Sequence, residues 1–239
     1  MSDNLGTRMK EQYENRVRYA LPRRTYTLIR VDGKAFHTFT KGCQRPYDES
    51  LVAAFNVAGL TLCAAAQGVE MAYLQSDELS FLLTDFASDK TEAWFDGNVQ
   101  KITSIAASVV TAAFNRYWKE RHFADHQLAF FDARVWTIPD PTEVENYFIW
   151  RQQDATRNSI SMLAQHHFSH RELQGKSGPE MQELLHSERG INWNDQPSAF
   201  KRGRTIIHDD NGWEVEPDIP IFTTPEGREW LRRRIPRYA

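Results

Sequence analysis

The chain has 239 residues, of which 41% are hydrophobic and 26% charged, so it can build a folded core and is not a disordered, collagen-like or coiled-coil sequence. Its net charge of −3 is unevenly spread: residues 1–47 carry 10 Lys and Arg against 4 Asp and Glu, whereas residues 48–155 carry 7 against 16. An acidic total with a basic beginning permits local patches for a polyanion, although charge runs are usually solvated surface.

The two cysteines, Cys43 and Cys63, form no CxxC motif and are too few for a disulfide framework, so structural zinc is not expected either. The first 18 residues contain no apolar stretch of signal-peptide length. The most apolar window, residues 51–69, is rich in alanine and interrupted by polar residues, which is typical of a buried helix. We therefore expect a cytoplasmic protein.

The first predicted strand covers residues 26–31 and ends at Asp32-Gly33, a pair that favours turns. A polar loop follows to Tyr47, and a helix begins at about Asp48, a plausible N-cap. Residues 70–75 and 79–83 are then predicted to form two strands, which are joined by the polar turn 76–78. This first half predicts a strand, a helical crossover and a hairpin.

A second long helix is predicted over residues 98–118 and a fourth strand over 128–136. The order βαββαβ matches the split-βαβ, ferredoxin-like arrangement, with an antiparallel sheet and helices on one face. We therefore expect an α+β protein in which residues 1–136 form the core. Residues 137–239 are expected to pack on this core as a helical and β-rich extension, with helices at about 142–170 and 179–188.

In this topology the third strand lies antiparallel to the first, so the end of one is beside the start of the other. Asp32 and Asp77 are then neighbours. Two adjacent carboxylates repel each other, and Mg²⁺ prefers such a site because it binds one or two carboxylates and completes its shell with phosphates. The alternative is that Asp32-Gly33 is an ordinary turn and Asp77-Glu78 the polar tip of a hairpin.

The loop after Gly33 carries Lys34, His37, Lys41 and Arg45 within one short segment. Cationic side chains of this kind are the donors that a triphosphate needs. The loop therefore favours the interpretation of the two aspartates as a magnesium and nucleotide site.

Five segments resemble the tRNA-His guanylyltransferase family in order and spacing: RVDGKAFHTF, AYLQSDELSF, FDARV, WRQQDATRNS and INWND followed by FKRG. The likeness runs from about Asn4 to about Arg204. It implies a polymerase-palm core and addition of nucleotides to the 5′ end of an RNA, in the 3′-to-5′ direction. ATP or GTP activates a 5′-monophosphate, and the 3′-hydroxyl of an incoming GTP or other template-matched nucleotide attacks the activated phosphorus.

The resemblance also implies roles for particular residues. Two Mg²⁺ ions are held by Asp32, Asp77 and the main chain of Gly33, with Glu78 as a supporting catalytic carboxylate. The implied nucleotide-binding residues are Arg30, Lys34, Ala35, Phe36, His37, Arg45, Ser76 and Lys101. The implied tRNA-binding residues are Arg151, Asn158, Lys201, Arg202 and Arg204. The family also implies a homotetramer.

One departure bears on the substrate. Members that mark tRNA-His have His-Ile-Asn-Asn-Leu-Tyr-Asn after the Trp-Arg-Gln motif, whereas here the aligned residues 156–162 retain only Asn158. This favours the bacterial and archaeal guanylyltransferase-like branch, which repairs 5′-truncated tRNAs by copying the opposing strand. Obligatory marking of tRNA-His is the alternative.

Several other interpretations stay open at this point. Trp150 is either an RNA contact or a core aromatic, and Arg151 is either an RNA contact or the partner of a carboxylate. His166, His167 and His170 lack a further ligand and are not expected to bind metal. A palm-type nucleotide cyclase and a non-catalytic RNA-binding module are the distant alternatives for the whole protein.

Overall fold

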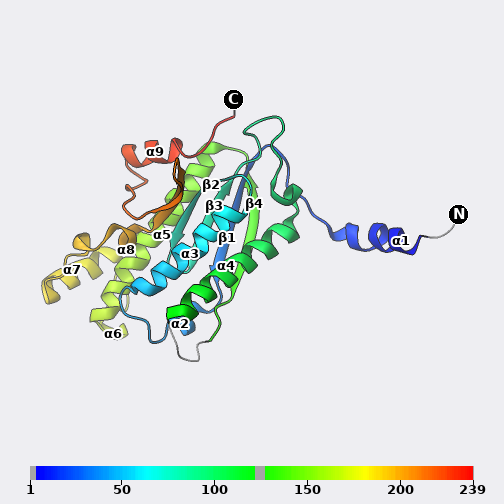
Figure 1. Cartoon of the computed structure of the whole chain (residues 1–239). Helices are drawn as coiled ribbons and strands as arrows, with labels where there is room; N and C mark the ends of the chain where they lie inside the picture. Colours follow the sequence, from blue (N-terminus) through cyan, green and yellow to red (C-terminus); the bar gives the residue numbers. More distant parts are fainter. Residues whose placement is uncertain (1–3, 122–126, 239) are drawn as a thin grey trace.

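A computed structural model describes residues 4–121 and 127–238 of the chain. The six described strands form one antiparallel sheet in the order β4-β1-β3-β2-β5-β6 (Figure 1). The strands are β1 (Tyr26–Gly33), β2 (Val69–Gln75), β3 (Glu78–Leu83), β4 (Phe131–Ile138), β5 (Arg204–Asp209) and β6 (Gly212–Glu216). The central order β4-β1-β3-β2 confirms the predicted ferredoxin-like core, with β3 between β1 and β2.

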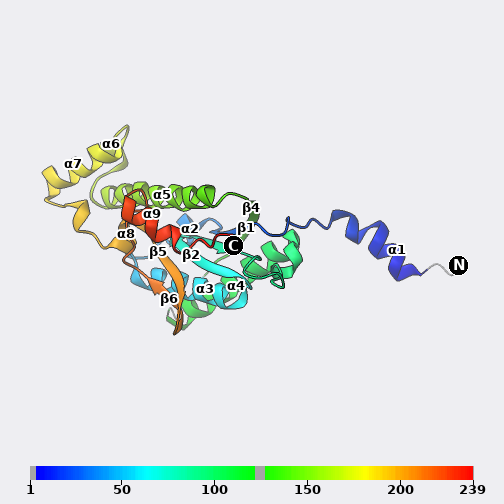
Figure 2. The same cartoon turned by 90° about the horizontal axis from the view of Figure 1, so that it is seen from above.

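Helices cover both faces of this sheet (Figure 2). The longer ones are α3 (Glu49–Ala65), α4 (Val99–Arg121), α5 (Pro141–His167) and α7 (Gly178–Arg189). The shorter ones are α1 (Leu5–Gln12), α2 (Phe36–Phe39), α6 (His170–Leu173), α8 (Ser198–Arg202) and α9 (Pro225–Arg232). The two core helices, α3 and α4, lie together on one face as predicted, and α5 covers the other.

The alternation of side chains along β1 explains this arrangement. Ile29 and Val31 belong to the hydrophobic core beneath α3 and α4, whereas Tyr26 and Leu28 belong to the core beneath α5 and α9. Because successive residues of a strand point to opposite faces, a strand with apolar residues at both odd and even positions is buried on both sides. A third apolar cluster joins the end of α5 to α7 and α8.

The structure differs from the predicted boundaries in several places, among them the fourth strand, predicted over 128–136 and observed at Phe131–Ile138. The hairpin turn has two residues, Ser76 and Asp77, because Glu78 already pairs with Gln75. The helix predicted to reach residue 170 ends at His167, since Phe168 is extended and Ser169 caps α6. The first strand continues through Gly33, which pairs with Phe131.

The C-terminal part, whose course the sequence pattern does not define, extends the core sheet. β5 pairs with β2 over Met71–Leu74, and β6 pairs with β5. The division into a core of residues 1–136 and an extension of residues 137–239 stays a prediction, with β4 running to Ile138. Every helix in the described ranges is too short or too polar to cross a membrane.

An aromatic cluster fixes α2 to the main body. Phe114 of α4 is fully buried, and its ring lies 5.6 Å from those of Phe36 and Phe39, 4.9 Å from that of Phe55 and 5.4 Å from that of Phe131. Aromatic pairs at such distances stabilise a fold beyond their buried area. The segment that follows Gly33 is therefore held by the core on the α4 side.

We expect Phe114→Ala to lower the free energy of unfolding by about 3–5 kcal/mol, because it leaves a cavity within this cluster. Urea denaturation followed by circular dichroism measures the change. Ile105→Ala on the exposed side of the same helix is the matched control and is expected to change stability by less than about 1 kcal/mol. A loss below about 1 kcal/mol for Phe114→Ala would contradict the proposed support of α2.

Candidate active site

The ends of β1 and of the β2–β3 hairpin meet, as the topology predicts. The Gly33 N–H donates a hydrogen bond to the Asp77 carbonyl oxygen at 3.1 Å. Asp32 lies directly opposite Glu78 in the sheet register. The prediction that Asp32 and Asp77 are neighbours is therefore confirmed.

Gly33 is required at this junction by a close approach. A Cβ atom at position 33 would lie 2.2 Å from the Phe36 ring, well inside contact distance. The chain then turns sharply, with Ala35 in the left-handed conformation at φ 55°. The aromatic ring of Phe36 is thereby placed in the core while the backbone before it remains beside Asp77.

Asp32 and Asp77 are half-buried and differ from the fully buried acids Glu78, Asp85 and Glu145, each of which is paired with an arginine. Neither aspartate takes part in an ion pair among residues 4–121 and 127–238, and the carboxylate of Asp77 accepts a hydrogen bond from the Ser76 hydroxyl at 3.1 Å. Burial raises the pKa of Asp77, and the neighbouring charge of Asp32 adds to the rise. Burial also raises the pKa of Asp32, and the negative charge of Asp132 raises it further. Neither carboxylate therefore has an ion-pair partner in the described chain, and the charges of Arg30, Arg134 and Arg151 only oppose the rise in the pKa of Asp32.

Glu78, by contrast, is neutralised by the protein. Its two carboxylate oxygens accept hydrogen bonds from Arg151 of α5 at 2.7 and 2.8 Å, and both side chains are buried. Arg151 also binds Asp154 at 2.8 Å. Of the two interpretations of Arg151, partnership with a carboxylate is correct. Its predicted tRNA contact is wrong, because a buried guanidinium with its donors occupied does not face an RNA.

A fourth acid beside the site was not among the predicted residues. Asp132 of β4 lies directly opposite Asp32, and directly opposed residues share one face of a sheet. Asp132, Asp32 and Glu78 therefore point toward the α5 side together. The FDARV motif of the sequence contains Asp132. Its place beside Asp32, however, follows only from the pairing of β4 with β1.

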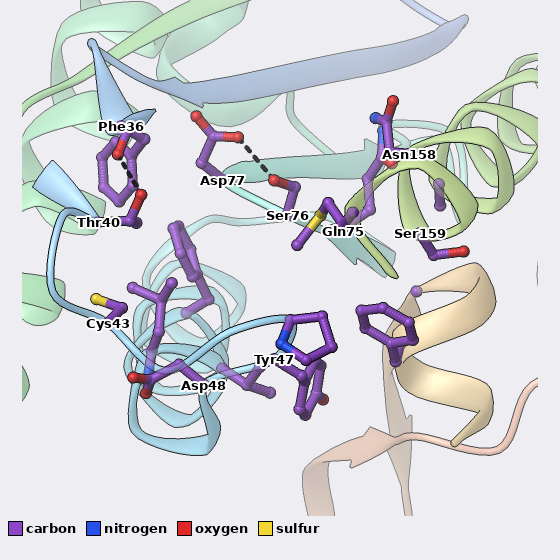
Figure 3. A pocket seen from close by; sticks show the side chains of 18 of the residues that line it. Phe36, Thr40, Cys43, Tyr47, Asp48, Gln75, Ser76, Asp77, Asn158 and Ser159 are labelled. Carbon is purple, nitrogen blue, oxygen red and sulfur yellow. Dashed lines mark hydrogen bonds between the residues drawn. The ribbon is translucent and has the colours of Figure 1, made fainter. Parts of the chain in front are cut away.

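A cavity of about 520 Å³ lies next to Asp77 (Figure 3). Its lining residues fall within four parts of the chain, which are residues 33–55, 75–77, 155–162 and 199–204. Phe55, Met162 and Phe200 give it apolar walls, while Asp77 and Asn158 supply polar groups. An apolar cavity with a few polar groups is typical of a small-molecule site.

Most of the predicted nucleotide-binding residues line this cavity. These are Ala35, Phe36, His37, Arg45 and Ser76, together with Gly33 and Asp77. Lys34 is exposed next to them. Arg30 lies on the α5 side of the sheet instead, with its Nε 4.0 Å from Glu78 Oε2. The structure therefore gathers the loop residues around one space and leaves Arg30 beside the buried ion pair.

Lys101 is not brought to this site. It lies in the first turn of α4, and at about 1.5 Å per residue it is roughly 25 Å along the helix from Trp118. Trp118 is the residue whose ring lies 5.5 Å from that of Phe39 in α2. Lys101 therefore does not line the cavity of its own chain, and its triphosphate contact stays a prediction.

The remaining predicted tRNA contacts have different surroundings. Asn158 is exposed and lines the cavity. Arg204 is buried, donates to Asn56 and to the Val52 carbonyl, and has its pKa lowered to about 10 by burial. Its predicted contact with RNA phosphate is wrong, because the side chain is buried and bonded to α3 within the fold.

Lys201 and Arg202 also have partners inside the protein. Arg202 donates to the Ile219 carbonyl and to Ser198, both at 2.9 Å. Lys201 donates to the Asn194 carbonyl and lies 5.6 Å from the Trp193 ring. Their contact with tRNA stays a prediction.

The donor set fits magnesium. Asp32, Asp77 and the Gly33 carbonyl are hard oxygen donors from two adjacent backbone segments, and neither carboxylate forms an ion pair in the described chain. Mg²⁺ is bound in this way, by one or two carboxylates, with waters and substrate phosphates completing its shell. The three residues therefore have the chemistry of a magnesium site at the edge of a cavity.

We expect Arg151→Met to lower the free energy of unfolding by about 3–5 kcal/mol, because it leaves Glu78 buried without a partner. The same change in a Glu78→Gln background is expected to have a much smaller effect. Chemical denaturation of the wild type, both single variants and the double variant measures this coupling. Additive single effects would show that the ion pair does not stabilise this end of the sheet.

Comparison with known proteins places this geometry in a family. A family model described as tRNAHis guanylyltransferase matches residues 6–139, which is more than half of the chain. A tRNA(His) guanylyltransferase from Debaryomyces hansenii is 31% identical over 215 residues, covering 83% of this chain and 78% of the relative. One from Eremothecium gossypii is 30% identical over 199 residues, covering 76% and 82%.

Solved structures give the same result. A bacterial tRNA(His) guanylyltransferase (Thg1)-like protein in complex with ATP matches with a TM-score of 0.91 and 45% identity, over 96% of this chain and 98% of that chain. One in complex with GTP matches with a TM-score of 0.82 and 40% identity over the same shares. The enzyme from Saccharomyces cerevisiae has a TM-score of 0.73 and 25% identity, over 88% and 96%. The chain therefore belongs to the tRNAHis guanylyltransferase family and is a nucleotidyltransferase.

Proposed function

We propose that this protein adds nucleotides to the 5′ end of tRNA in the 3′-to-5′ direction, using the opposing strand as template. In the first step an oxygen of the RNA 5′-monophosphate attacks the α-phosphorus of ATP or GTP, and pyrophosphate leaves. In the second, the 3′-hydroxyl of the incoming nucleotide attacks the activated 5′ phosphorus, the nucleoside monophosphate leaves, and the hydroxyl proton passes to solvent.

One observation supports this function above the others. Asp77 lines a cavity of about 520 Å³ and Asp32 lies beside it, neither carboxylate forms an ion pair in the described chain, and bacterial relatives of this fold are solved in complex with ATP and with GTP. A non-catalytic RNA-binding module does not need two unpaired acids beside a cavity, because they repel the RNA backbone. Membership of a nucleotidyltransferase family agrees with a catalytic role for them.

Within this proposal Asp32, Asp77 and the Gly33 carbonyl hold two Mg²⁺ ions. When bound, magnesium supplies positive charge that stabilises the attacking and leaving oxygens of a phosphoryl transfer. The protein itself provides no nucleophile. Its own contribution is to position the reacting groups and to supply donors such as His37 and Arg45 at the cavity rim, next to where phosphates have to lie.

Glu78 and Arg151 have a positioning role in this scheme. Their buried ion pair holds the first residue of β3 against α5, directly opposite Asp32. Tyr147 of α5 adds a contact of 2.8 Å to Ser80 of the same strand. The carboxylate of Glu78 therefore supports the site by fixing the strand that carries the Asp77 turn, and it does so without binding metal.

We further propose that the physiological substrates are 5′-truncated tRNAs of more than one kind. Two observations support this choice over tRNA-His marking alone. Asn158 is the one retained residue of the segment typical of tRNA-His enzymes. Identity is 45% and 40% to bacterial (Thg1)-like proteins but 25% to the Saccharomyces cerevisiae enzyme.

A homotetramer in the cytoplasm completes the proposal. The assembly is supported by α1, which projects away from the sheet in Figures 1 and 2 and leaves Leu5, Met9 and Tyr13 exposed. A helix of 8 residues is too short to be stable by itself in water, so a contact with another copy of the chain explains its formation.

The central experiment gives the enzyme a tRNA that lacks its first nucleotide, with MgCl₂, ATP and labelled GTP, and measures label at the 5′ end. We expect incorporation by the wild type and a loss of at least about 100-fold in Asp32→Ala and Asp77→Ala. Asp210→Ala, an exposed acid in the β5–β6 turn, is the control and is expected to retain activity. Full incorporation by both site variants would contradict the proposed metal ligands.

The same assay separates the two substrate choices. Comparable rates on truncated tRNA-His and on other truncated tRNAs support general 5′-end repair. Incorporation confined to a single G opposite position 73 of tRNA-His would overturn it in favour of tRNA-His marking. A cyclic product from GTP alone, without RNA, would instead identify a nucleotide cyclase.

We also expect Asp77→Asn to raise the melting temperature of the metal-free protein at neutral pH. The pKa of Asp77 is raised in the folded state, so its ionisation disfavours folding at pH values above that pKa. The difference from the wild type is expected to shrink as the pH falls through the raised pKa toward the ordinary aspartate value. Differential scanning fluorimetry measures it.

Magnesium provides the second half of this test. Addition of MgCl₂ is expected to raise the melting temperature of the wild type and to have little effect on Asp77→Asn, because a ligand that binds only the folded state stabilises it. A lower melting temperature for metal-free Asp77→Asn at neutral pH would show that the carboxylate is compensated in the fold.

A further inference from the structure

Gln75 carries an unsatisfied hydrogen-bond acceptor at the wall of the nucleotide cavity. It is the last residue of β2, its side chain is 4% exposed, and its Oε1 has no hydrogen-bond partner within the described chain. Figure 3 shows it between Ser76 and the α5 residues Asn158 and Ser159. A buried acceptor without a donor is costly, so such groups usually have a partner when the protein works.

The orientation of this amide is set by α5. Gln75 Nε2 lies 3.5 Å from Asp154 Oδ2, to which it donates. Asp154 also accepts from Arg151 at 2.8 Å and from Arg157 at 2.7 Å. Burial acts to raise the pKa of Asp154, but Arg151 outweighs it and holds that pKa below its ordinary value. An ionised carboxylate only accepts, so the amide nitrogen faces Asp154 and the oxygen faces away from it.

The ligand atom that satisfies Oε1 has to be a donor. The phosphates of a nucleotide only accept, which leaves the ribose hydroxyls and the N–H groups of the base. Gln75 precedes Asp77 by two residues, so their Cα atoms are at most about 7.6 Å apart. Ribose is the part of a nucleotide next to its phosphates, whereas the apolar walls at Phe55 and Phe200 suit the base.

We propose that Gln75 is a specificity-determining residue whose Oε1 accepts a hydrogen bond from a ribose hydroxyl of the nucleotide in the cavity. The proposal rests on the proposed function, since it takes that cavity as the nucleotide site. Asp154 is then a positioning residue, which acts through Gln75 by fixing the direction of its amide. The two residues together make the site prefer ribonucleotides to their deoxy forms.

The test is equilibrium binding of ATP, 2′-deoxy-ATP and 3′-deoxy-ATP to the full chain with MgCl₂, by isothermal titration calorimetry. We expect the wild type to bind one deoxy analogue about tenfold more weakly than ATP, and the analogue concerned identifies the hydroxyl. Gln75→Met retains the length of the side chain but lacks the acceptor, so it is expected to bind ATP and both analogues alike. Gln153→Met, an exposed glutamine on α5, is the matched control and keeps the wild-type ratio.

Asp154→Asn provides a second readout that does not remove the acceptor. An asparagine both donates and accepts, so the Gln75 amide is free to turn, and the preference for ATP over the analogue is expected to fall while affinity for the analogue is unchanged. If Gln75→Met has a lowered melting temperature, its weaker binding could reflect misfolding, and Asp154→Asn then serves as the test of the inference. If Asp154→Asn had the same ratio of affinities for ATP and the deoxy analogue as the wild type, the inference would be overturned.

Two further results would also overturn it. One is equal binding of all three nucleotides by the wild type, as expected if water alone satisfies Oε1. The other is a loss in Gln75→Met that is the same for all three. Failure of the wild type to bind ATP at all would contradict the proposed function and this inference with it, whereas binding without discrimination contradicts the inference alone.

Discussion

The site depends on an electrostatic constraint at one end of the sheet. The register places Asp32 directly opposite both Glu78 and Asp132, and the hairpin turn adds Asp77. Four carboxylates in so small a region repel one another, and the partial burial of Asp32 and Asp77 reduces the screening by water at these two. The protein neutralises Glu78 with Arg151 but leaves Asp32 and Asp77 without an ion pair in the described chain. The repulsion between Asp32 and Asp77, which no protein ion pair relieves, makes this end of the sheet suitable for a divalent cation.

The rest of the fold holds this strained arrangement in place. β1 and β3 are apolar on both faces, so their register cannot slip without exposing core residues to solvent. Phe36, inserted among the rings around Phe114, fixes the segment that follows Gly33. The Glu78–Arg151 pair joins the hairpin to α5 on the opposite side. Contacts on both faces of the sheet therefore oppose the separation that charge repulsion favours.

The C-terminal part does more than cover the sheet. Residues 155–162 and 199–204 form one side of the cavity, facing the segment from Gly33 to Phe55. Arg204 reaches across to α3, where it binds Asn56 and the Val52 carbonyl, and so ties the two sides together. A ligand in the cavity therefore contacts the ferredoxin-like core and the following segments at once. The orientation of Gln75 by Asp154 is one consequence of this shared wall.

The sequence by itself determined the βαββαβ order and the meeting of Asp32 with Asp77, because strand patterning and a short polar turn are local properties that leave little choice of topology. It also supplied the family, through motifs around those two acids. The tertiary structure decided which arginine and lysine side chains lie near those acids and which form contacts in other parts of the fold. The sequence motifs predict Arg151 and Arg204 as RNA contacts, yet both are buried and hydrogen-bonded within the protein. Lys101 lies in the first turn of α4, at the end of that helix away from α2. The position of Asp132 and the unsatisfied oxygen of Gln75 likewise appear only when β4 pairs with β1 and α5 packs on the sheet, since they depend on contacts between residues 79 to 100 positions apart in the chain.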